Sequence, residues 1–176
     1  MKRGELGLNY FPLDTDIITD EKVCLLENRF GLVGFGVLIK LYLKIYKAGY
    51  YYTFNKVEQE VFILDNKIKL ALLNDILNYL FELELLDKNL YTKYNVLSSR
   101  GIQKRYLAIY AKLPEIKIIN KYLLLKSQEI NMYENVVLVY EKSDNKARLP
   151  FKYKLNGAGK CLSNEDANLL IDMLEL

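Results

Sequence analysis

The residues most suited to chemistry in this chain are six cations in a stretch, Lys88 to Pro114, that has no aspartate or glutamate. Tyrosines lie between these cations. Lysine and arginine bind phosphate oxygens, so a run of cations with interleaved aromatic rings favours nucleic-acid binding. The cations are Lys88, Lys93, Arg100, Lys104, Arg105 and Lys112.

The second half of this stretch is predicted to be a helix over residues 100–112, capped by Ser98 or Ser99 and stopped by Pro114. Helical spacing places its four cations opposite its apolar side chains. Such a face fits a solvated surface of an ordinary packing helix and a phosphate-contacting surface equally well, and the lack of nearby acids favours the second. The cations are Arg100, Lys104, Arg105 and Lys112, opposite Ile102, Tyr106, Ile109 and Leu113.

A second set of candidates lies on a predicted helix over residues 67–84, where Lys67, Lys69 and Asn74 are the polar residues able to read bases or contact phosphates. The acids Asp75 and Glu82 follow on the same helix. Packing or dimerisation through this helix is therefore an equal alternative to base reading.

The chain lacks the residue patterns that enzyme catalysis usually requires. The chain has no histidine, which excludes histidine-based catalysis and histidine-ligated zinc. Its two cysteines, Cys24 and Cys161, form no CxxC pair and indicate a reduced protein. The segment 157–161 lacks the spacing of a phosphate loop. The acids of residues 14–21 fit helix capping better than a metal site. We expect no enzyme activity, no cofactor and no bound metal.

Length and composition predict a folded cytoplasmic protein. The 176 residues are 51% hydrophobic and 27% charged, which excludes disorder as the main state, and the net charge is +3. No apolar run reaches the roughly 18 residues of a membrane span. The start of the chain, Met1 to Glu5, lacks the apolar stretch of a signal peptide.

The order of predicted elements is that of a winged helix-turn-helix, in a mainly α member of the α+β class. Extra helices precede the domain and follow its wing, and a small C-terminal α/β appendage completes the chain. The predicted boundaries are 1–112 for the winged-helix domain with its arm and 113–176 for the appendage. The expected elements are an arm over 4–18, helices 21–30, 33–48, 56–64 and 67–84, strand 50–54, a hairpin over 85–97, helix 100–112, strands 136–140 and 147–155, and a last helix ending near 174.

Three segments resemble one family. They are Gly7-Leu8-Asn9-Tyr10-Phe11-Pro12-Leu13-Asp14 running on to Asp20-Glu21-Lys22, then Phe30-Gly31-Leu32-Val33-Gly34-Phe35 with Ile45-Tyr46-Lys47-Ala48-Gly49-Tyr50-Tyr51, and Leu97-Ser98-Ser99-Arg100-Gly101-Ile102-Gln103-Lys104-Arg105-Tyr106. Together they resemble the N-terminal domain of phage and prophage replisome-organiser proteins, the relatives of DnaD. The resemblance implies a winged helix and a role in starting DNA replication, through DNA binding, self-association or helicase loading.

The sequence thus predicts a non-enzymatic phage or prophage protein that binds DNA, duplex or single-stranded, and self-associates. The alternative is a protein-interaction module, such as a phage-encoded inhibitor of a host enzyme or of a replication or defence complex. Binding to random duplex DNA at low salt separates the two.

Overall fold

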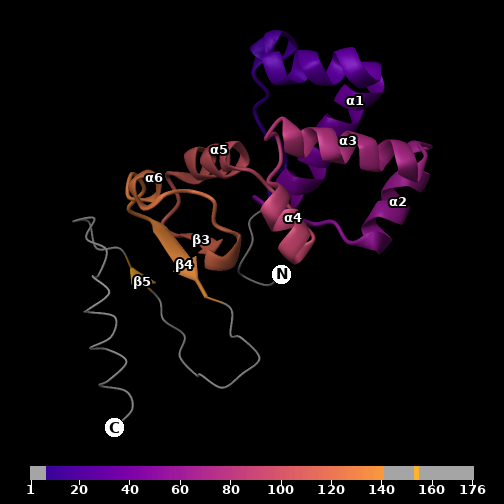
Figure 1. Cartoon of the computed structure of the whole chain (residues 1–176). Helices are drawn as coiled ribbons and strands as arrows, with labels where there is room; N and C mark the ends of the chain where they lie inside the picture. The colour runs from indigo at the N-terminus through magenta and orange to yellow at the C-terminus, as the bar shows by residue number, and fades with distance from the viewer. Residues whose placement is uncertain (1–6, 141–152, 155–176) are drawn as a thin grey trace. The chain divides into compact units, whose positions relative to one another are not determined.

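A computed structural model describes residues 7–140 and the backbone of 153–154 (Figure 1). It is mainly helical with two small sheets, as expected for a mainly α member of the α+β class. The chain divides into two compact units, Met1–Ile109 and Tyr110–Leu176. Among the described helices, none combines the length and the apolar character that crossing a membrane requires.

The first unit is built on α1, Glu21–Ala48, which is two helical segments joined at a kink. Asp20 caps its start, because the Asp20 carboxylate accepts hydrogen bonds from the backbone N–H groups of Lys22 (2.9 Å) and Val23 (3.1 Å). Gly31 has φ 61° and ψ −161°, a conformation open to glycine and costly for other residues. The predicted cap and the predicted break at Gly31 are both confirmed.

Two further helices pack on α1. Helix α2 spans Lys56–Asn66 and α3 spans Leu70–Glu82, with three residues between them. The apolar positions of α3 recur with a helical period and pack against α1. Burying a leucine or isoleucine completely contributes about 1.5–3 kcal/mol, so these contacts dominate the stability of the unit. The fully buried side chains include Leu38, Leu41 and Ile45 of α1 and Leu73, Ile76 and Leu80 of α3.

The strand that follows α1 pairs with the end of the segment that was predicted to be a hairpin. Strand β1, Tyr52–Thr53, is antiparallel to β2, Val96–Leu97, with Tyr52 opposite Leu97 and Thr53 opposite Val96. This pairing brings together the two ends of the segment between the strands, residues 54–95.

The predicted hairpin over 85–97 is wrong, because helix α4, Lys88–Tyr94, takes the place of its turn and of most of its second strand, and strand β2 keeps only Val96–Leu97. Asp87 accepts a hydrogen bond from the N–H of Leu90 (2.7 Å) and so caps a helix. Asn95 ends the helix in the left-handed conformation, at φ 53°. The Asp-Lys-Asn sequence that favours a turn also favours a helix start, and here the helix forms.

The arm before α1 lies along the helix. Residues 15–19 form a short 3₁₀ helix, η1 (Thr15–Thr19), within the predicted extended segment. The N–H of Leu8 donates to the carbonyl of Tyr46 (2.8 Å), and the Phe11 ring stacks on Tyr46 at 4.5 Å. This backbone bond and this aromatic contact fasten the arm to α1.

The second unit contains a three-stranded sheet. Strand β3, Ile116–Ile119, is parallel to β4, Val136–Val139, and β5, Tyr153–Lys154, is antiparallel to β4. The predicted strand at 136–140 is confirmed. A 3₁₀ turn, η2 (Asn120–Tyr122), and helix α6, Ser127–Ile130, lie between β3 and β4. The predicted last helix, the rest of the strand over 147–155, and residues 157–161 lie outside the described residues.

Candidate nucleic-acid interface

Helix α5, Arg100–Tyr110, has one buried apolar face and one exposed face, which carries two of the four predicted cations. Ile102, Tyr106 and Leu107 are buried, while Arg100 and Lys104 are exposed. Arg100 and Lys104 are one turn apart and so share a side of the helix. The cationic side chains of α5 therefore reach solvent without taking part in the core.

A buried polar link holds the beginning of α5. Gln103 is 1% exposed, and its amide nitrogen lies 3.4 Å from the Ser98 hydroxyl. Ser98 in turn donates to the carbonyl of Tyr50 (2.7 Å), 48 residues earlier in the chain. Since buried polar groups are costly to leave unpaired, this link fixes where α5 starts.

The first residues of α4 and α5 lie at one surface. The N–H of Asp87 donates to the carbonyl of Ser98 (2.8 Å), which joins the residue before α4 to the residue two positions before α5. A cavity of about 390 Å³ opens here, and both Lys88 and Arg100 line it. We call Lys88, Arg100 and Lys104 the α4–α5 basic surface.

Two acids line the same cavity, and both have other contacts. The Asp87 carboxylate caps α4 through Leu90. The Glu84 carboxylate lies 3.7 Å from the ammonium of Lys22, which α1 supplies.

Arg105 does not belong to this surface. Its guanidinium donates to the Tyr46 hydroxyl (3.4 Å) and lies with Asp14 and Tyr42 around a second cavity of about 300 Å³, between the arm and α1. Burial raises the pKa of Tyr42 to about 12, although the charge of Arg105 acts in the opposite direction. Arg105 therefore fastens α5 to α1 and the arm, a contact across 59 residues that helical spacing cannot reveal.

The other residues that the sequence predicted to contact nucleic acid lie on several different elements. Lys112 lies in the second unit, beyond the end of α5 at Tyr110, so the predicted helix over residues 100–112 is too long and does not carry Lys112. Lys67 ends α2 in the left-handed conformation and Lys69 precedes α3, so both lie in a turn. Asn74 is exposed on α3. Lys93 lies on α4 with its ammonium 5.2 Å from the centre of the Tyr94 ring.

The acidic residues near the start of the chain have structural roles. Asp20 caps α1, and Asp14 and Asp16 line the cavity that Arg105 shares. No group of three aspartate, glutamate or cysteine side chains converges on a metal position anywhere in residues 7–140. Cys24 is half-buried and is a free thiol whose sulfur lies 3.4 Å from the carbonyl of Ile18.

Comparison with known proteins identifies the family. Residues 10–102 match the family described as Lin1244/Lin1753-like, N-terminal, and the chain belongs to this family. It is a phage-related family. The chain is 35% identical over 132 residues to the uncharacterized phage-related protein Lin1244/Lin1753 of Listeria innocua serovar 6a. The match covers 74% of this chain and 43% of the relative, so the chain spans less than half of that protein. No solved structure matches this chain.

Proposed function

We infer that this protein is a non-enzymatic DNA-binding protein of phage or prophage origin that acts in the initiation of DNA replication in the bacterial cytoplasm. The single observation that carries the inference is the α4–α5 basic surface, Lys88, Arg100 and Lys104, on helices that contain no carboxylate. Lys88 of α4 and Arg100 of α5 line one cavity, where both cations can contact phosphate oxygens.

The order of elements supports the same reading. Helix α1, strand β1, helices α2 and α3, and a strand β2 that pairs with β1 follow each other as in a winged helix. Here α4 stands where a two-stranded wing is expected. The family resemblance adds the role in replication and the expectation of self-association.

The second helix of the turn unit, α3, is a weaker candidate for DNA contact. Asp75 lies beside Asn74 on its exposed side, and Glu82 near its end pairs with Arg29 of α1 (3.8 Å). Carboxylates repel phosphates. Glu84 and Asp87 also line the α4–α5 cavity, but the three cations of the basic surface outnumber them there, so we place the main contact on α4 and α5.

The test compares three variants that each remove positive charge. The first, Lys88→Gln with Arg100→Gln and Lys104→Gln, removes the α4–α5 basic surface. The second, Lys67→Gln with Lys69→Gln, removes the cations of the turn before α3. The third, Lys47→Gln with Lys56→Gln, removes exposed lysines from α1 and α2 and is the control. Binding to random duplex DNA is measured by fluorescence anisotropy at about 50 mM salt.

We expect the first variant to lose at least about tenfold in affinity, because three phosphate contacts and their counterions are lost. The other two should stay within about threefold of the parent. An unchanged affinity in the first variant contradicts the assignment of the surface. Loss only in the second variant would place the contact at α3, and no binding by the parent would remove the DNA-binding function.

A further inference from the structure

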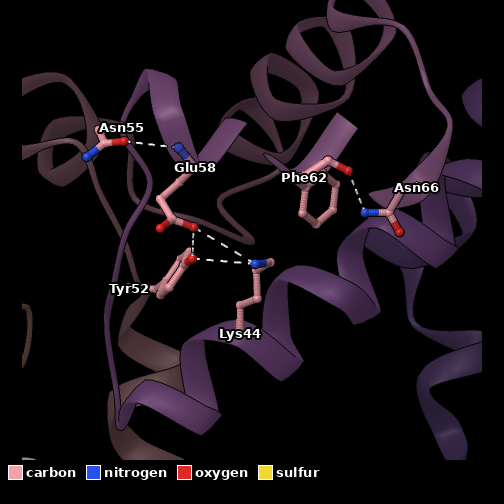
Figure 2. Close-up of polar contacts among 6 residues, drawn as sticks. All are labelled: Lys44, Tyr52, Asn55, Glu58, Phe62 and Asn66. Atoms are coloured by element: carbon pink, nitrogen blue, oxygen red, sulfur yellow. Dashed lines mark hydrogen bonds and ion pairs between the residues drawn. The ribbon is translucent and has the colours of Figure 1, made fainter. Parts of the chain in front are cut away.

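Helix α2 has an inner face that is fully engaged with its own unit. The Glu58 carboxylate lies 3.9 Å from the Lys44 ammonium and accepts a hydrogen bond from the Tyr52 hydroxyl (Figure 2). Phe62 is completely buried, and the Asn66 amide donates to the carbonyl of Phe62 (2.7 Å). These residues face α1 and β1 and fix the rotation of α2 about its axis.

The opposite face of α2 is apolar and exposed. Val57, Val61 and Leu64 are 65%, 42% and 76% exposed. Their spacing of four and then three residues sets them in one stripe, with Phe62 and Asn66 on the other side of the helix and Glu58 about 90° from the centre of the stripe. Single exposed apolar residues are common on proteins, but three in one helical stripe form a surface that water covers poorly. We call these three residues the α2 stripe.

Acids border the α2 stripe on both sides. Helical spacing places the exposed Glu60 about 70° from the centre of the stripe on one side and the exposed Asp65 about 70° from it on the other. The cations Lys56 and Lys67 lie only at the two ends of the helix. An apolar stripe between two carboxylates is complementary to an apolar stripe flanked by lysine or arginine.

The same charges disfavour a second copy of this chain. An antiparallel pairing that brings Val57 of one copy to Leu64 of the other also sets Glu60 against its own counterpart. Like charges across a contact are destabilising. In a complex with a basic partner, the carboxylates on both sides of the stripe attract the lysine or arginine side chains of that partner.

We propose that the α2 stripe is a docking surface for a basic amphipathic helix of a protein partner. This surface is separate from the α4–α5 basic surface, because α2 and α5 lie on opposite sides of α3 and α4 in the first unit (Figure 1). The protein can thus hold a partner on α2 while α4 and α5 remain accessible.

The probe is a synthetic amphipathic peptide of leucine and lysine, with leucines at helical spacing, and the control peptide carries glutamate in place of lysine. We expect the lysine peptide to bind the full chain and the glutamate peptide to bind at least tenfold more weakly in fluorescence anisotropy. Val61→Gln with Leu64→Gln should weaken lysine-peptide binding at least tenfold. Glu60→Gln with Asp65→Asn should weaken it and reduce its salt dependence.

Leu43→Gln is the matched control, because Leu43 is an exposed apolar residue of α1, 52% exposed, outside the stripe. It should leave peptide binding unchanged. Equal binding by the stripe variant and the parent, or no binding by the parent, overturns the proposal. A parent dimer in sedimentation that Leu64→Gln converts to a monomer also overturns it, because a second copy is then the occupant. Unchanged circular dichroism confirms that each variant is folded.

Discussion

Replacing one exposed threonine distinguishes helix α4 from the hairpin that its sequence favours. Thr92 is exposed within Lys88–Tyr94. Alanine is the better helix former, so Thr92→Ala should stabilise a helix by about 0.5 kcal/mol. In a strand the same change removes a favourable β-branched residue and should destabilise by up to about 1 kcal/mol. The sign of the effect therefore reports the local structure.

Thr53 supplies the matched control, because it is an exposed threonine in strand β1. Thr53→Ala should lower the free energy of unfolding, while Thr92→Ala raises it. With a urea m-value of about 2 kcal/mol/M, the two midpoints should differ by roughly 0.5 M. Both variants are measured by urea unfolding with circular dichroism. If the two substitutions destabilise the protein alike, residues 88–94 are extended and the description of α4 fails.

Two further predictions concern stability. Phe62→Ala should lower the free energy of unfolding by about 3–5 kcal/mol, because Phe62 is fully buried. Leu64→Ala on the same helix should change it by under about 0.5 kcal/mol, because Leu64 is exposed. Urea midpoints check both values, and equal costs would contradict the orientation of α2. Above pH 10 the unfolded chain loses the Tyr42 proton that the folded chain retains to about pH 12, so stability should fall as pH rises through this window. Tyr42→Phe should reduce that slope by up to about 1.4 kcal/mol per pH unit in unfolding measured at several pH values, and an unchanged slope would contradict the raised pKa.

Local chemistry made much of the first unit predictable. Asp20 and Asn55 each cap a helix through their own side chains, and Gly31 breaks α1 with a conformation suited to glycine. These signals act over a few residues, so sequence spacing reveals them. The pairing of β1 with β2 followed from the order of the elements.

The predictions that failed share one physical cause, because each concerns residues whose structure depends on contacts with distant parts of the chain. Asp87 can begin a turn or a helix, and the bond from its N–H to Ser98 belongs to the folded unit. Helical spacing assigns both Arg105 and Lys104 to one cationic face, but the Arg105 guanidinium donates to the Tyr46 hydroxyl of α1. The α2 stripe was readable from the spacing of Val57, Val61 and Leu64, yet only the engagement of Phe62 and Glu58 shows which face remains outside.

The salt dependence of DNA binding tests the central claim most directly. Each phosphate contact on duplex DNA contributes about 0.9 to the slope of the logarithm of affinity against the logarithm of salt concentration. The three cations Lys88, Arg100 and Lys104 should therefore make the parent slope steeper, by roughly 2.7, than that of the variant with glutamine at all three positions. Equal slopes for parent and variant, with binding intact, would contradict the claim that this surface holds DNA.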